Sequence, residues 1–191
     1  MFAHKKKYFL IIKSIRDINL RKIKKYNKFI IIYRNKDYNE KIVDLLKFRK
    51  ECRLKLIKFY VANNLSLCVR LNSDGIYLSS YNKDLKILRF KRENFDIIGS
   101  AHNIKEIYLK KKQRCNYILF SKLFMVDYAK SSPIIGTVKF NKYLNYVSHI
   151  LVPLGGIKTT NLNSLKNINS EGFAVMSEIK KKPAKIINRL F

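Results

Sequence analysis

Glycine, proline and tryptophan are scarce in this sequence, and acidic residues are few. The 191 residues include 6 glycines, 3 prolines and no tryptophan, and only 13 Asp and Glu stand against 41 Lys and Arg. This scarcity, together with 47% hydrophobic residues, excludes a collagen-like or low-complexity chain and indicates a globular one. No apolar run approaches the roughly 20 residues that a membrane-spanning helix needs. We therefore expect one domain over residues 1–191, with no membrane partner.

Cysteine is also sparse. Cys52, Cys68 and Cys115 are odd in number and widely spaced, and no Cys-x-x-Cys pair occurs. This pattern provides neither a disulfide framework nor a zinc site. At the start of the chain a short apolar run is interrupted by Lys13, and no small-residue cleavage site follows, which argues against a signal peptide. The sequence thus predicts a protein of the reducing cytoplasm.

The excess of basic residues gives a formal net charge of +28. Such a surface attracts nucleic acid or anionic lipid over long range. Lysine far outnumbers arginine, however, and Asn, Ile, Tyr and Phe are abundant, as expected from coding DNA rich in A and T. No arginine-rich tail, RNP-type aromatic motif or Cys/His finger is present. We favour solvated surface lysine and expect no specific nucleic-acid partner; a basic nucleic-acid-binding protein is the alternative.

Eight short apolar runs recur along the chain. Their alternation is not strict, which is typical of strands buried on both faces of a parallel sheet. The runs cover residues 8–12, 29–33, 58–62, 75–78, 96–99, 116–120, 150–154 and 172–176. Helical spacing is found between most of them, at residues 38–53, 104–112 and 161–168, with little room at 65–72. The alternation predicts an α/β chain folded as a single (β/α)8 TIM-type barrel with some short helices; an open doubly wound sheet is the alternative.

Polar side chains follow most of the strands. In a barrel the chemistry takes place at this carboxyl-terminal end. The residues there are mostly Arg, Lys, Ser, Asn and Gly, with almost no carboxylates, and this set suits an anion, most simply a phosphate. They include Arg34, Lys36, Asn63, Asn64, Ser100, His102 and Lys122.

Two of the six glycines stand together after the seventh strand. Gly155 and Gly156 would let backbone N–H groups approach a phosphate without a Cβ in the way. A helix starting near residues 159–161 would add its free donors and the positive end of its dipole. Met176 and Ser177, after the eighth strand, complete the predicted phosphate site. A tight strand-to-helix turn is the alternative explanation of the glycine pair.

Five segments resemble the thiamine phosphate synthase family, which includes the thiazole tautomerase (TenI) branch, in order and spacing. They are SDGIYLSS (73–80), IIGSAHNIKEI (97–107), CNYILFSKLF (115–124), VPLGGIKTTNL (152–162) and EGFAVMSEI (171–179). The resemblance covers about residues 28–180 and is weaker over the first strand. It implies a (β/α)8 barrel and a transferase that joins a pyrimidine methyl pyrophosphate to a thiazole phosphate, with magnesium assistance.

Position by position, the resemblance implies substrate-binding roles. The pyrophosphate pair corresponds to Arg34 and Lys36. Further substrate contacts correspond to Asn63, Ser100 and, approximately, Lys130. The thiazole-phosphate cradle corresponds to Gly155, Gly156, Ile157 and Ser177.

Two positions depart from the family in a way that bears on metal binding. The expected magnesium aspartates are replaced by Asn64 and Asn82. Hard cations prefer charged oxygen ligands, so the substitutions predict weak magnesium binding and weak synthase activity unless Asp84 takes over as a ligand.

The acid/base position also differs. Lys122 stands where the tautomerase branch has its acid/base histidine, and with a lowered pKa it could move protons; His102 is the second candidate. A solvated or phosphate-contacting Lys122 and a loop-bonded His102 are the alternatives.

We therefore expect a family protein that binds thiazole phosphate, as a weak synthase, a tautomerase-like enzyme or a non-catalytic phosphate-binding protein. Its expected partners are small phosphorylated substrates, and a homodimer is left open. The lysine clusters at 5–7, 110–112 and 180–182 are expected to be solvated helix ends or termini.

Overall fold

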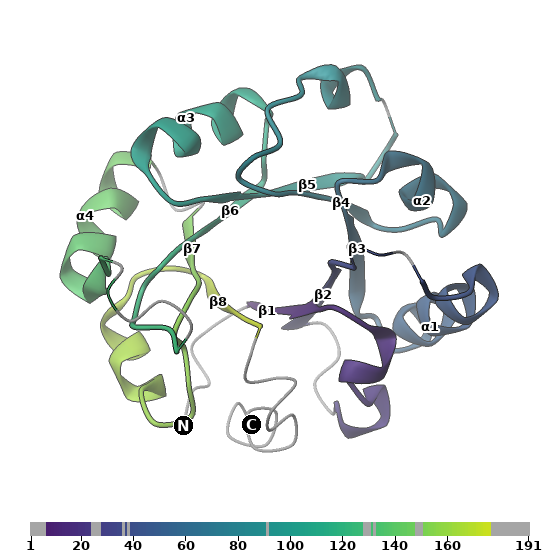
Figure 1. Cartoon of the computed structure of the whole chain (residues 1–191), viewed down its shortest axis with the longest axis horizontal. Coiled ribbons are helices and arrows are strands. Elements are labelled where there is room, and N and C mark those ends of the chain that lie inside the picture. Colours follow the sequence, from purple (N-terminus) through teal and green to yellow (C-terminus); the bar gives the residue numbers. More distant parts are fainter. Residues whose placement is uncertain are drawn as a thin grey trace.

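Eight parallel strands form one sheet in the order β7-β6-β5-β4-β3-β2-β1-β8. The computed structural model describes residues 7–23, 28–35, 37, 39–90, 92–127, 131, 133–147 and 151–176. The strands are β1 (Lys7–Ile12), β2 (Phe29–Tyr33), β3 (Lys58–Ala62), β4 (Gly75–Leu78), β5 (Asp96–Ala101), β6 (Tyr117–Phe120), β7 (Leu151–Pro153) and β8 (Gly172–Val175). A parallel bridge between Leu154 and Ala174 joins β7 to β8 and closes the barrel (Figure 1). The predicted barrel is confirmed, and the open sheet is wrong.

Helices surround the barrel (Figure 1). The α-helices are α1 (Ile42–Leu54), α2 (Leu65–Arg70), α3 (Ile104–Lys112) and α4 (Gly136–Val147). Short 3₁₀ helices are η1 (Ile15–Asp17), η2 (Leu20–Lys22), η4 (Lys86–Arg89) and η5 (Leu162–Asn167). The predicted helices before β3 and after β5 are confirmed, α4 was not predicted, and the segment after β7 is a 3₁₀ helix.

The core has an inner and an outer part, because successive side chains of a strand point to opposite faces. Phe9 and Ile11 of β1 belong to the cluster inside the barrel, with Tyr60, Tyr77 and Leu119 from other strands. Tyr8, Leu10 and Ile12 belong to the larger cluster between strands and helices. Burial on both faces explains why the strands appear in the sequence as continuous apolar runs.

Charged groups bond to one another at the amino-terminal end of the barrel. Asp96 accepts hydrogen bonds from Lys58 Nζ and from the Tyr60 hydroxyl, both at 2.7 Å. Arg49 pairs with Asp74 at 2.8 Å. Asp74, which directly precedes β4, thus lies at the end of the barrel opposite the mouth.

The three cysteines are free thiols and all are buried, so no disulfide joins them. Among the described residues, no helix has both the length and the apolar character needed to cross a bilayer.

Candidate functional site at the barrel mouth

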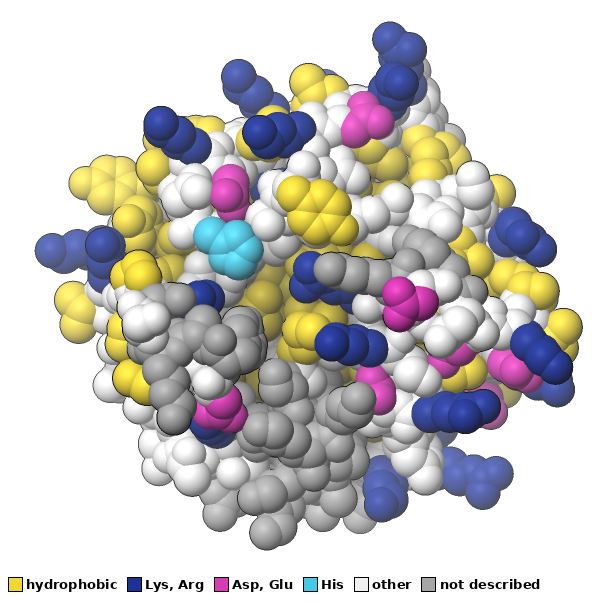
Figure 2. Space-filling model, viewed as in Figure 1, with side chains coloured by type: hydrophobic (Ala, Val, Ile, Leu, Met, Phe, Trp, Pro, Cys, Tyr) yellow, Lys and Arg dark blue, Asp and Glu magenta, His cyan; other side chains and the backbone are white. Residues whose placement is uncertain are grey.

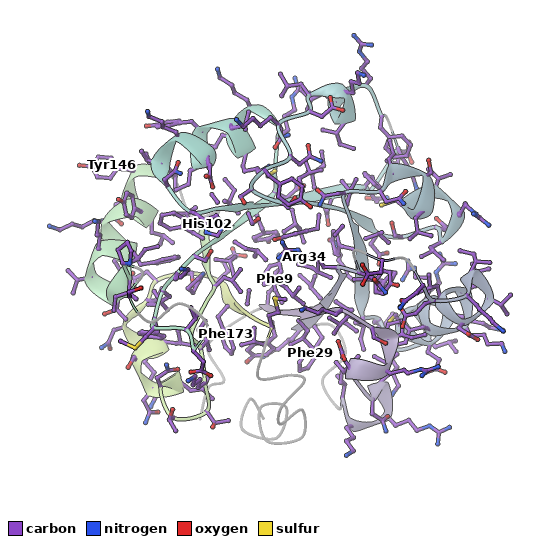
Figure 3. All side chains as sticks on the ribbon, viewed as in Figure 1. Phe9, Phe29, Arg34, His102, Tyr146 and Phe173 are labelled. Carbon is purple, nitrogen blue, oxygen red and sulfur yellow. The ribbon has the colours of Figure 1, made fainter. Side chains whose placement is uncertain are left out.

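Arg34 lies just beyond β2 and points into the carboxyl-terminal mouth of the barrel (Figure 3). Beneath it, burial raises the pKa of Tyr77, while a hydrogen bond with Ser100 and the positive charge of Arg34 act in the opposite direction. Tyr77 and Ser100 therefore bond to each other within range of the Arg34 charge. Within the described part of the chain, no carboxylate pairs with Arg34. The guanidinium is thus available to an anion.

A cavity of about 640 Å³ opens beside Arg34, between the ends of β1, β2 and β8. Its size suits a small ligand. Met176 and Arg34 line it together, and Lys13, Ser14 and Arg16 after β1 contribute as well. Two carboxylates, Asp37 and Glu40, also line it. The expectation of a rim almost free of carboxylates is therefore wrong here, because the segment before α1 folds back over the mouth.

Glu40 is held by its neighbours. Its Oε1 accepts hydrogen bonds from Ser14 Oγ at 2.7 Å and from the Ile15 N–H at 2.9 Å. Burial raises the pKa of Glu40, but the hydrogen bonds from these groups, Tyr33 and Asn35 outweigh burial and leave the pKa below its ordinary value. Glu40 therefore ties the loop after β1 to the start of α1.

Asn63 organises a cluster of amide and hydroxyl groups after β3 and β4. Its Nδ2 donates to Ser79 Oγ at 2.8 Å and to the Tyr81 hydroxyl at 3.1 Å. Its Oδ1 accepts from the Ser79 N–H at 3.1 Å and from Asn82 Nδ2 at 3.2 Å. The backbone of Asn63 has φ +55°, a left-handed conformation that asparagine tolerates better than most residues. The cluster carries no formal charge.

Asn64 and Asn82, at the positions of the family's magnesium aspartates, bond to backbone N–H groups. Asn64 caps α2, its Oδ1 accepting from the Leu67 N–H at 2.9 Å. The Oδ1 of Asn82 accepts from the Asp84 N–H at 3.0 Å, and Asp84 Oδ1 accepts from the Lys86 N–H at 2.8 Å. These side-chain oxygens serve backbone N–H groups, and two of them are neutral, so they fit a hard divalent cation poorly. Nor does the described part of the chain contain another group of three His, Cys, Asp or Glu that could hold one.

His102 lies at the rim of the mouth (Figure 3). Its Nδ1 is 2.9 Å from Ser121 Oγ, and its backbone N–H donates to Glu106 at 2.7 Å. The predicted loop-bonded histidine is thus present, and the exposed ring keeps Nε2 free of hydrogen bonds to the described residues. Lys122 follows Ser121 directly, and its backbone packs against Gly155. The structure therefore gathers His102, Ser121, Lys122 and the glycine pair on one side of the mouth.

Both glycines of the pair have left-handed backbones, with φ +95° at Gly155 and +69° at Gly156. A Cβ on Gly156 would lie 2.4 Å from the Met125 carbonyl oxygen and 2.5 Å from that of Phe124. The absence of a side chain at Gly156 thus allows the loop after β6 to pack closely against the glycine pair. The N–H groups of Gly156 and Ile157 donate to no acceptor within the described residues, which leaves them available to a ligand.

The segment after the glycines differs in part from the prediction. The Asn161 side chain does not cap the next helix; it donates to the Gly156 carbonyl at 2.8 Å and accepts from the Lys158 N–H at 2.8 Å. The following helix, η5, is a six-residue 3₁₀ helix. A helix therefore begins where it was expected, with Asn161 at its N-cap position, but it is a short 3₁₀ helix and the Asn161 side chain bonds within the preceding turn.

The sequence model of the thiamine monophosphate synthase family (TMP-TENI) matches residues 19–179. The chain belongs to this family. It is 28% identical over 151 residues to the thiamine-phosphate synthase of Prochlorococcus marinus subsp. pastoris, a match over 78% of this chain and 43% of that protein. It is 24% identical over 153 residues to that of Persephonella marina, over 78% of this chain and 73% of the relative. The chain thus spans less than half the length of the first relative and about three quarters of the second.

The fold comparison agrees with the family. The thiamine phosphate pyrophosphorylase of Pyrococcus furiosus superimposes with a TM-score of 0.73 at 18% sequence identity, covering 100% of both chains. The resemblance noted from five sequence segments is therefore confirmed for this member of the thiamine monophosphate synthase family.

Some predicted site residues of this family member are not compared with the structure. Lys36, Lys130 and Ser177 lie outside the described residues. Sequence reasoning also missed groups that the fold brings to the mouth. Neither Ser121, which bonds His102, nor Tyr81 was singled out as a site residue. Asn64 as a helix cap could have been found, since an asparagine directly precedes the helical run.

Proposed function

We propose that this protein binds a thiazole phosphate, or a closely related phosphate ester, at the mouth of its barrel, and that its magnesium-dependent synthase activity is weak. Membership of the family supports the ligand class, because the relatives are named as thiamine-phosphate synthases. The observation that carries the proposal is Arg34, a cation without a carboxylate partner among the described residues, beside a cavity of about 640 Å³. Guanidinium groups bind phosphate oxygens strongly and directionally.

The proposal assigns further contacts of the ligand. Ser100 and Tyr77 would supply hydroxyl groups within reach of the Arg34 charge. The N–H groups of Gly156 and Ile157, which donate to no acceptor among the described residues, would bind phosphate oxygens on the other side of the mouth. Lys36, Lys130 and Ser177 would add to these contacts if the resemblance holds at their positions. His102, oriented by Ser121, is the better-placed proton-transfer group, with Lys122 as the second candidate.

Binding is tested by calorimetry with thiazole phosphate. Arg34→Met removes the charge but keeps an unbranched side chain, and we expect the affinity to fall about tenfold or more, as the loss of one charge-assisted contact predicts. Arg89→Met is the matched control, since Arg89 is exposed on η4 and the net charge changes equally. Equal affinities of the two folded variants would place the ligand elsewhere.

Synthase activity is tested by product analysis with the pyrimidine pyrophosphate and the thiazole phosphate, with magnesium and with a chelator. We expect little thiamine phosphate and little effect of the chelator. Turnover at about 1 s⁻¹ or faster that chelation abolishes would contradict the weak synthase.

Restoring the carboxylates provides the converse test. Asn64→Asp with Asn82→Asp keeps both backbone acceptors, because aspartate also caps helices and turns. The double variant should gain stabilisation by magnesium in a melting experiment. Asn94→Asp, exposed just before β5, is the charge control and should gain none.

A further inference from the structure

Lys110 is completely buried, although it belongs to a run of three lysines at the end of α3. Its Nζ donates to the carbonyl oxygens of Ser79 at 2.8 Å and Asn82 at 2.7 Å, and to Gln113 Oε1 at 2.9 Å. The expectation of a solvated 110–112 cluster is therefore wrong for Lys110, whereas Lys111 and Lys112 are exposed as predicted.

Gln113 completes the same contact. It is also fully buried, and its Nε2 donates to the carbonyl oxygens of Asn82 at 3.2 Å and Asp84 at 2.9 Å. The two side chains of α3 and its carboxyl-terminal end thus bind three carbonyl groups of the loop that follows β4, residues 79–84. Carbonyl groups of a loop would otherwise take their hydrogen bonds from water.

Gly99 makes room for the lysine. A Cβ at this position would lie 2.8 Å from Lys110 Cδ and 2.9 Å from its Cγ. The stem of Lys110 therefore runs across β5 where that strand has no side chain. A glycine inside β5 is otherwise unfavourable for a strand, so its presence agrees with this close approach.

The front of the same loop faces the mouth. Ser79, Tyr81 and Asn82 all bond to Asn63, as described above. The loop is thus held from behind by α3, while its polar side chains converge on one asparagine at the candidate site.

A buried ammonium is a costly way to stabilise a fold. Burial lowers the pKa of Lys110, against the opposing effects of Cys115 and Glu106, and the ammonium forms no ion pair within the described residues. An apolar side chain of similar volume is often as good or better for stability alone. The directional bonds to three acceptors indicate that the lysine fixes geometry.

We propose that Lys110 is a positioning residue: its ammonium, with the Gln113 amide, fixes loop 79–84 and so prearranges the Asn63 cluster for the ligand of the mouth. The identity of that ligand rests on the proposed function, whereas fixation of the loop does not. The positive charge that holds loop 79–84 is thus the ammonium group of Lys110.

The first experiment measures amide hydrogen exchange of the ligand-free protein. In Lys110→Met the amides of residues 79–85 should exchange at least tenfold faster than in wild type, with α1 and β1–β2 unchanged. Lys111→Met makes the same substitution at the exposed neighbour and should behave as wild type. Unchanged protection of the loop in a folded Lys110→Met variant would overturn the proposal.

The second experiment distinguishes positioning from stability. At a temperature where both proteins are fully folded, thiazole phosphate should bind Lys110→Met at least tenfold more weakly than Lys111→Met. Equal affinity would reduce Lys110 to a stabilising residue and contradict its positioning role. If wild type fails to bind thiazole phosphate, the proposed function fails, while hydrogen exchange still decides on the loop.

A third variant covers a failure of Lys110→Met to fold. Gln113→Met leaves the ammonium and its bonds to Ser79 and Asn82, but it removes the amide donor to Asn82 and Asp84 and the acceptor that Gln113 offers to Lys110. It should speed exchange of residues 83–85 more than that of residues 79–81. If residues 79–85 of Gln113→Met exchange at the same rates as in wild type, the proposal is contradicted.

Discussion

The cysteines show how strongly burial acts on single residues here. Burial raises the pKa of Cys52 and Cys115 to about 12 and that of Cys68 to about 11. A thiol must be ionised and accessible to react. At about pH 8 we therefore expect Ellman's reagent to label none of the three cysteines in the folded protein and all three in denaturant. One rapidly labelled thiol in the native state would contradict this burial.

Glu40 makes the free energy of unfolding depend on pH. Because the pKa of Glu40 in the fold is below its ordinary value of 4.5, its carboxylate contributes stability above that pH, and the contribution is lost as the pH falls through the lowered pKa. Glu40→Gln should lower the free energy of unfolding by about 1 kcal/mol at neutral pH, the size of a typical hydrogen bond, because solvent screens the half-buried carboxylate.

The pH dependence of that variant is the more specific result. Glu40→Gln should lose less stability than wild type between neutral pH and about pH 3, measured by urea unfolding. Glu51→Gln on α1 is the control, since Glu51 is exposed. The same acid response in Glu40→Gln and wild type would assign the stability loss to other carboxylates.

At the residue scale, the charge of a side chain can be predicted from the sequence, whereas its hydrogen-bond partners cannot. Asn64 and Asn82 could be recognised as poor metal ligands because an amide carries no charge. Their hydrogen-bond partners could not be predicted, because these depend on where α2 begins and how loop 79–84 turns. The burial of Lys110 was not predicted for a related reason. It depends on the space at Gly99 and on the amide of Gln113, and a run of three lysines indicates neither.

At the scale of elements, the strands were predictable because both faces of each are buried, which leaves an apolar run in the sequence. Helix α4 was missed although Phe140, Tyr143, Leu144 and Val147 have helical spacing, and three of them are buried. The helix start predicted near Asn161 is present, but the helix is of the 3₁₀ type. The bond of the Asn161 side chain to the Gly156 carbonyl is a tertiary contact that local preference does not determine.

Two of the three glycines with left-handed backbones, Gly136 and Gly156, have different surroundings and make a matched pair. Gly156→Ala meets carbonyl oxygens at 2.4–2.5 Å, and Gly136→Ala, at φ +71°, meets nothing within 4 Å. We expect Gly136→Ala to cost about 1 kcal/mol of unfolding free energy for the backbone alone, and Gly156→Ala about 2 kcal/mol or more, because overpacking is added.

Denaturant unfolding measures this difference, and equal costs would show that the loop after β6 does not press on Gly156. The result also bears on ligand binding. A charged substitution such as Gly156→Asp would distort that loop whether or not phosphate binds there, so Arg34→Met is the cleaner probe of the mouth.

At the scale of the whole molecule, the net charge of +28 is the feature that the fold explains least. Figure 2 looks onto the face that carries His102, and its Lys and Arg side chains lie along the upper, left and right edges and near the middle rather than in one place. A nucleic-acid site would gather them into a stripe or patch. On this face the spread favours solvated surface charge, as the composition suggested.

Binding to duplex DNA tests this interpretation. A dispersed positive surface should bind any sequence alike, with a dissociation constant of about 10⁻⁴–10⁻⁶ M at physiological salt and a steep loss of affinity as salt increases. Fluorescence anisotropy with two unrelated duplexes and a salt series measures both properties. Thiazole phosphate should compete weakly at most, because the cavity beside Arg34 occupies a small part of the surface. A nanomolar complex that discriminates between the duplexes would require a basic patch outside the face in Figure 2, and the charge would then be functional.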